Sequence, residues 1–146
     1  MTWGEIQKIS LEKMFAKNEP IEIEVIEDIE DLKDDDDCKW YLSAMPAVCN
    51  EAIERIKPHV MNMFKYNEET GKYDKTTVKH VKTDTPSNEV LELPEDACAL
   101  IPLYIASQLY KDDDIAQATA YRNEFEVGLQ DLVYHKENQD SIREVY

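Results

Sequence analysis

Apolar residues recur every three or four positions along residues 91–134, which is the spacing of one face of an α-helix. This pattern predicts a helix over residues 94–110 and a second over residues 114–134, joined by a short acidic turn. The apolar face of the first helix comprises Ala97, Leu100, Ile101, Tyr104, Ile105 and Leu109. That of the second comprises Ile115, Ala118, Arg122, Phe125, Leu129 and Leu132. Because the turn is short, we expect the two helices to be antiparallel neighbours.

The ends of these two helices have favourable residues. Pro94 suits a first helical position, where its missing N–H costs nothing. Pro102 lies inside the first helix and removes one backbone hydrogen bond, so we expect a kink between Cys98 and Pro102. Asp114 is a favourable N-cap for the second helix.

Two further helices are predicted in the first part of the chain. Thr2 and Glu5 have the spacing of a capping box, and an apolar face follows, which predicts a helix over residues 3–17. Another apolar face predicts a helix over residues 37–57, which Pro46 either kinks or delays.

Residues 60–93 have a different pattern. Residues 61–66 and 73–81 are typical of strands, and Gly71 in the loop between them suits a hairpin turn. Residues 90–93 are a candidate third strand. The predicted fold is therefore mainly α: a small bundle of about four helices, with a short β-hairpin insertion at about residues 60–93 between the second and third long helices. One domain covers residues 1–135, and residues 136–146 form a C-terminal tail.

The charge narrows the choice of partners. The chain has 32 acidic and 16 basic residues among 146, a formal net charge of −16, which opposes binding to DNA phosphates or to anionic membranes. Eleven of the acidic residues lie in residues 19–37, an arm without the glycine and alternating ligands of a calcium loop, whose role stays open. No apolar run is long enough to cross a membrane, and the first residues lack the core of a signal peptide. Three widely spaced cysteines fit reduced cytosolic thiols better than a disulfide framework or a metal site.

No catalytic, cofactor-binding or metal-ligating residues are assigned. The three glycines are isolated, the three histidines lack metal-ligand spacing, and no pair of carboxylates is singled out. We expect no cofactor and no enzymatic activity.

Two features are candidates for interactions, and a third is weaker. Arg122 lies on an apolar face, so either its stem packs there with the guanidinium in solvent, or it binds a carboxylate across the bundle or across a subunit interface. In the tail, Ile142, Val145 and Tyr146 either belong to a fraying end or dock into a partner. A small basic group, either a solvated hairpin face or a contact for a phosphate or an acidic neighbour, consists of Lys72, Lys75, Lys79, His80 and Lys82.

Three stretches resemble one family of proteins. They are MTWGEIQKISLEKMF, YLSAMPAVCNEAIERI and LELPEDACALIPLYIASQLYKDDDIAQATAYRNEFEVGLQDL, and they are similar to head–tail connector adaptor proteins of tailed bacteriophages. The resemblance implies a structural virion protein at the head–tail interface, made in the host cytoplasm. It implies a ring of many copies, commonly twelve, that binds the portal protein on one side and a tail completion or tail protein on the other. Genomic DNA would pass through the ring without specific binding, and Ile142, Val145 and Tyr146 would dock on the portal.

The alternative from a different class is an acidic protein that mimics DNA and inhibits a nucleic-acid-binding host protein. Such an inhibitor needs carboxylates at phosphate-like spacing on one extended face. Here the acidic residues cluster in one arm and two turns, which counts against it. Capture of a basic protein would favour it.

Overall fold

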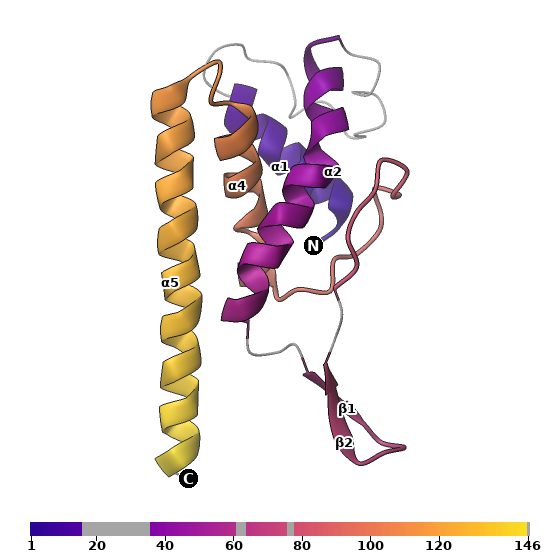
Figure 1. The fold of residues 1–146 in the computed structure, drawn as a ribbon, viewed down its shortest axis with the longest axis vertical. Helices are drawn as coiled ribbons and strands as arrows, with labels where there is room; N and C mark the ends of the chain where they lie inside the picture. The colour runs from indigo at the N-terminus through magenta and orange to yellow at the C-terminus, as the bar shows by residue number, and fades with distance from the viewer. Residues whose placement is uncertain (16–35, 61–63, 76–77, 146) are drawn as a thin grey trace.

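The computed structural model of the protein describes residues 1–15, 36–60, 64–75 and 78–145, and these are mainly helical, as predicted (Figure 1). The helices are α1 (Trp3–Phe15), α2 (Asp36–Ile56), the short 3-10 helix η2 (Lys57–His59), α3 (Glu95–Cys98), α4 (Ile101–Leu109) and α5 (Ile115–Val145). Two strands, β1 (Phe64–Asn67) and β2 (Lys72–Lys75), lie between η2 and α3.

Helix α4 is the centre of the fold. It packs against α1, α2 and α5, and every one of its residues except Gln108 is buried. A helix that is apolar on all sides needs cover on all sides, which the three longer helices supply. Figure 1 shows α5 running antiparallel beside α4 after the turn that joins them.

The predicted helix start and interruption are confirmed. Cys98 ends α3 and Ile101 begins α4, so the chain breaks where Pro102 was expected to disturb it. Pro102 thereby occupies the first turn of α4, where no hydrogen bond is lost. Asp114 Oδ1 accepts a hydrogen bond from the Gln117 N–H at 3.0 Å and so caps α5.

Helix α1 begins where Thr2 predicts it. The Thr2 hydroxyl accepts a hydrogen bond from the Glu5 N–H at 3.2 Å, as expected for an N-cap. Helix α2 passes through Pro46 without interruption and ends at Ile56, before Pro58.

The end of α5 differs from the prediction. We expected the helix to stop at Tyr134, and instead it continues to Val145. Residues 134–145 contain neither glycine nor proline, so nothing in the local sequence terminates the helix. In Figure 1 α5 extends well past the ends of α4 and α2.

The strands also differ from the prediction. β1 and β2 pair antiparallel, with Phe64 opposite Lys75, and Gly71 in the loop has a φ of 69°. They span four residues each, so the long second strand expected to reach Val81 is wrong. The third strand expected at residues 90–93 is also wrong, because only an isolated bridge between Thr2 and Val90 forms.

The apolar residues of the segment after β2 explain this difference. They are buried against the helices and so cannot serve one face of a sheet. These residues are Val78, Val81, Leu91 and Leu93.

The N-terminus joins the segment over residues 87–91. The Trp3 N–H donates to the Glu89 carbonyl at 2.8 Å, and the Gly4 N–H to the Ser87 carbonyl at 2.8 Å. A Cβ on Gly4 would lie 3.0 Å from that Ser87 oxygen, so the close approach depends on glycine.

Candidate functional site

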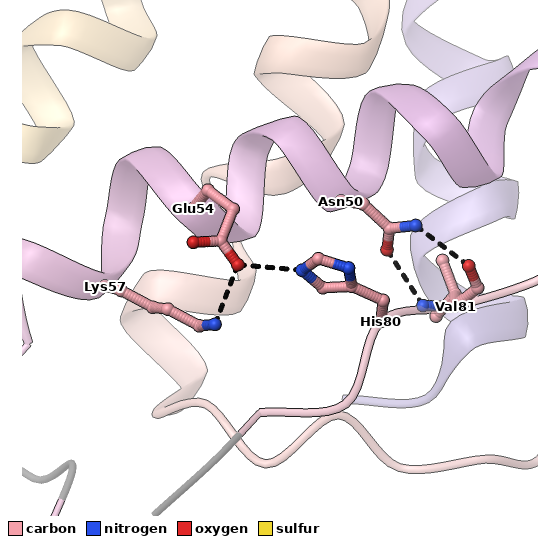
Figure 2. A network of polar contacts seen from close by, with 5 residues as sticks. All are labelled: Asn50, Glu54, Lys57, His80 and Val81. Atoms are coloured by element: carbon pink, nitrogen blue, oxygen red, sulfur yellow. Dashed lines mark hydrogen bonds and ion pairs between the residues drawn. The ribbon is translucent and has the colours of Figure 1, made fainter.

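A polar network fixes residues 80–81 on α2 (Figure 2). The Asn50 amide donates to the Val81 carbonyl at 2.9 Å, and its oxygen accepts from the Val81 N–H at 2.8 Å. One turn further along α2, Glu54 Oε1 lies 2.7 Å from Lys57 Nζ and 2.7 Å from His80 Nε2. These hydrogen bonds from Lys57 and His80 lower the pKa of the Glu54 carboxyl.

This network changes the interpretation of the predicted basic group. His80 contacts a carboxylate of its own chain, which gives it a structural role. Lys79 and Lys82 line a hollow of about 240 Å³ together with Glu89 and Glu92, so charges of both signs surround it. Lys72 and Lys75 lie in β2, where only the strand is described.

A second polar group lies around Tyr104, on the central helix. The Tyr104 ring is buried, with 2% of its surface exposed. Its hydroxyl donates to Glu51 Oε2 at 3.0 Å and accepts from Arg55 Nε at 3.2 Å. The guanidinium carbons of Arg55 and Arg122 lie 5.5 Å and 5.2 Å from the ring centre, which is cation–π geometry. Side chains of α2, α4 and α5 therefore converge on one ring.

Arg122, a predicted site residue, has both a carboxylate and this ring as neighbours. Its Nε donates to Glu126 Oε1 at 3.0 Å, and Glu126 lies one turn away on the same helix. Across the bundle, Arg122 therefore contacts the ring of Tyr104, whereas the two predicted interpretations placed its guanidinium either in solvent or on a carboxylate. A carboxylate from another subunit stays a prediction.

Arg55 and Tyr104 were missed as site residues. Arg55 lies on the polar side of α2, and Tyr104 follows the apolar spacing of α4 like any core residue. A tyrosine amid aliphatic residues was the available signal, because a buried hydroxyl needs a polar partner.

The third feature is the face of α5 that points away from the bundle. Ala118, Tyr121, Phe125 and Leu129 form its buried face. The opposite face, which we call the outer stripe, consists of the exposed residues Ala116, Thr119, Ala120, Asn123, Val127 and Gln130. Their spacing of three and four places them on one side of the helix. None of these six residues is charged, and 56% of the Val127 surface is exposed.

The charged residues of this part of α5 lie beside the outer stripe. By helical spacing, Arg122 and Glu126 border it on one side, and Glu124 and Asp131 border it on the other. Among the exposed sides of this part of α5, the one that faces directly away from the core is therefore without charge.

The predicted docking residues are placed only in part. Ile142 and Val145 belong to the last turns of α5, where the helix alone is described, and Tyr146 is outside the described residues. Their docking role stays a prediction.

The cysteines and the metal-ligating residue types complete the chemistry of the described part. Cys38, Cys49 and Cys98 are buried and not joined by disulfide bonds, in agreement with their expected role as small apolar residues. Burial raises the pKa of the Cys49 thiol to about 12, so the unreactive thiol form predominates. Within the described residues, no three histidine, cysteine, aspartate or glutamate side chains gather as metal ligands, and no helix is long and apolar enough to span a membrane.

Comparison with family models, curated proteins and solved structures gives no match for this chain. Function is therefore inferred from its residues and their geometry.

Proposed function

We propose that the chain is a structural virion protein: a head-to-tail adaptor that forms a ring, with twelve copies expected, below the portal. The ring extends the DNA channel and joins the head to the tail. The sequence stretches that resemble phage adaptors support this proposal, as does the mainly helical body.

The observation that carries the proposal is the outer stripe of α5. Copies of a chain with a net charge of −16 repel one another, so they associate best through a surface without charge. The cores of protein interfaces are depleted in charged residues. Six exposed, uncharged residues on the longest helix of an acidic chain fit a contact with a like-charged partner, that is, a second copy.

The same observation counts against a DNA mimic. An inhibitor of a basic protein would present its carboxylates where the partner binds. On α5 the carboxylates of Glu124, Glu126 and Asp131 instead flank the outer stripe, and the stripe itself is neutral.

The net charge suits a channel for DNA. A polyanion slides past an acidic wall because like charges repel, at a range that salt shortens to about 8 Å under physiological conditions. Sixteen net negative charges on each subunit, repeated around a ring, supply such a wall. DNA then passes without specific binding.

We assign portal docking to the C-terminal end of α5, with Ile142, Val145 and Tyr146 as the contact residues. The helix continues past the bundle in Figure 1, which supports this assignment because its last turns lie beyond the other helices. A helical segment shorter than about 12–15 residues is marginal in water on its own. The end of α5 beyond the bundle therefore depends on tertiary contacts for stability.

The test is the mass of the protein alone and after mixing with the portal protein of the same genome, measured by sedimentation. Three chains are compared with the wild type: Val127→Glu on the outer stripe, Val90→Glu as a matched control, and a deletion of residues 136–146. Val90 suits the control because its exposed fraction, 59%, is close to the 56% of Val127.

The proposal predicts a large closed complex of wild-type chain with portal. Val127→Glu should abolish the complex, Val90→Glu should leave it intact, and the deletion should abolish portal binding. A wild-type chain that stays monomeric and ignores portal overturns the proposal, and capture of a basic host protein would favour the DNA mimic.

A further inference from the structure

We propose that Arg55 and Arg122 form a clamp that binds carboxylates of Glu124 and Asp131 on α5 of a second copy of the chain. This inference rests on the proposed ring and assigns the ionic contacts between its subunits.

The clamp residues are held in place by their own helices. Arg55 Nε donates to the Tyr104 hydroxyl, and Arg122 Nε donates to Glu126. Each guanidinium group is therefore anchored through Nε, and the edge formed by its two terminal nitrogens is the one left to face a ligand. That edge fits the two oxygens of a carboxylate.

Neither acidic neighbour of Arg55 on α2 forms an ion pair with it among the described residues. Glu51 accepts the hydrogen bond of the Tyr104 hydroxyl, and Glu54 contacts Lys57 and His80. Arg55 donates its hydrogen bond to the hydroxyl of Tyr104, although the chain has twice as many acidic as basic residues. An arginine so placed has charge available for a carboxylate from outside.

The position of the clamp connects it to the outer stripe. Arg122 borders one side of the stripe, and its side chain is 32% exposed. Glu124 and Asp131 border the other side and are both exposed. In a ring each contact joins two different surfaces, so the stripe of one copy packs on another surface of the next copy. We assign the surface around the clamp to that role, because a stripe packed there brings Glu124 and Asp131 of one copy close to Arg55 and Arg122 of the next.

The spacing of the two sets of charges is compatible with one contact. Arg55 and Arg122 lie 5.5 Å and 5.2 Å from the same ring centre, so their guanidinium carbons are no farther apart than the sum of these distances. Glu124 and Asp131 are seven residues apart, which is about 10 Å along a helix. Two carboxylates on one helix can therefore meet both arginines.

The test uses charge reversal in the full chain, with the mass of the portal complex as the readout. One variant has Arg55→Glu and Arg122→Glu, a second has Glu124→Arg and Asp131→Arg, and a third has all four changes. The matched controls, Lys79→Glu with Lys82→Glu and Asp84→Arg with Glu89→Arg, change the net charge equally at exposed positions on another surface. Circular dichroism checks that each chain is folded.

The clamp predicts that each double reversal weakens assembly at least about tenfold, that the fourfold variant restores it, and that both controls assemble like the wild type. Raising the salt concentration should weaken wild-type assembly more than that of a variant with Arg55→Gln and Arg122→Gln.

Several outcomes overturn the clamp. Normal assembly of the Arg55→Glu, Arg122→Glu chain does so, as does a fourfold variant that stays unassembled. A third outcome combines two results: the Arg55→Glu, Arg122→Glu chain loses binding to a DNA oligonucleotide, and the Glu124→Arg, Asp131→Arg chain assembles normally. This outcome would assign the two arginines to phosphate instead. The proposed adaptor survives these results, whereas it fails if the wild type itself never joins the portal.

Discussion

The two faces of α5 are both free of charge, yet they differ in what they contain and in what covers them. The inner face has large side chains, Tyr121, Phe125 and Leu129, packed against the central helix of the same chain. The outer stripe has small or short side chains, and within the described residues nothing covers it. Large apolar residues stabilise a fold by removing area from water, whereas small ones let another backbone approach closely. One helix therefore has two different neutral surfaces: one packs in its own bundle, and the other is the surface that we propose contacts another copy.

Substitution of Phe125 should give the largest difference in stability between the inner face and the outer stripe. It is fully buried, and its ring centre lies 5.0 Å from that of Tyr104. We expect Phe125→Ala to lower the free energy of unfolding by about 3–5 kcal/mol, because it leaves a cavity beside α4. The measurement is urea unfolding of the purified chain. Val127→Ala on the outer stripe is the control and should change stability by less than about 0.5 kcal/mol; equal losses would remove the distinction between the faces.

Gly128 tests how closely the inner side of α5 approaches the bundle. A Cβ at this position would lie 2.3 Å from Leu100 Cδ2, so a side chain has to displace Leu100. We expect Gly128→Ala to destabilise the fold by about 1 kcal/mol, the cost of overpacking less the gain in helix propensity.

The control for this substitution is a second chain in which Leu100 is already shortened. In a Leu100→Ala background, Gly128→Ala should no longer destabilise, and it should gain the helix propensity of alanine, about 1 kcal/mol. Destabilisation that persists in that background would show that Leu100 does not limit the approach.

Much of this arrangement could be predicted from sequence, because its causes are local. Thr2 and Asp114 cap α1 and α5 through hydrogen bonds within a single turn. Pro102 lies in the first turn of α4, directly after the break that separates α4 from α3. The end of α5 was missed because a helix without glycine or proline gives no local stop signal. The third strand was predicted wrongly because Leu91 and Leu93 pack against helices, and apolar spacing alone does not tell which surface a segment faces.

The candidate surfaces were less predictable than the fold. Arg122 was found because an arginine interrupts an apolar face, but its contact with Tyr104 and the contribution of Arg55 depend on how three helices pack. The outer stripe was present in the sequence, yet a search for apolar periodicity passes over a face of alanine, threonine and asparagine.

Ala120 gives a small effect on stability and a large one on assembly. It is exposed, so Ala120→Glu should change the free energy of unfolding by less than about 0.5 kcal/mol. The same substitution places a carboxylate on the outer stripe and should abolish the complex with portal, because the charge is desolvated against a like-charged copy. Urea unfolding and sedimentation of the same sample measure the two effects. A variant that assembles normally would contradict the role of the stripe.

The pH dependence of stability provides the smallest effect, and it lies outside α5. The described residues of the inner face and the outer stripe contain no group with an ordinary pKa between 4 and 8, so neither face should lose stability under mild acid. Glu54 on α2 behaves differently, because Lys57 and His80 lower its pKa in the folded chain. Its contribution is fully present above the unfolded pKa of about 4.3 and is lost as the pH falls through the lower folded value.

The comparison that tests this is thermal unfolding of the wild type and of Glu54→Gln at pH 7 and at pH 3. The wild type should lose more stability than the variant over this range. Equal losses in the two chains would mean that the contacts of Glu54 add nothing in water.

The most direct test of the outer stripe as a contact between copies is photo-crosslinking inside the assembled complex. A benzophenone amino acid replaces Val127 in one chain and Val90 in a control chain, and each is mixed with portal and irradiated. Position 127 should give a covalent dimer, and mass spectrometry should identify the attached peptide as part of another copy of this chain. Position 90 should give far less of this dimer. Crosslinks from position 127 only to portal or tail proteins, or none in a complex that has formed, would contradict the central claim.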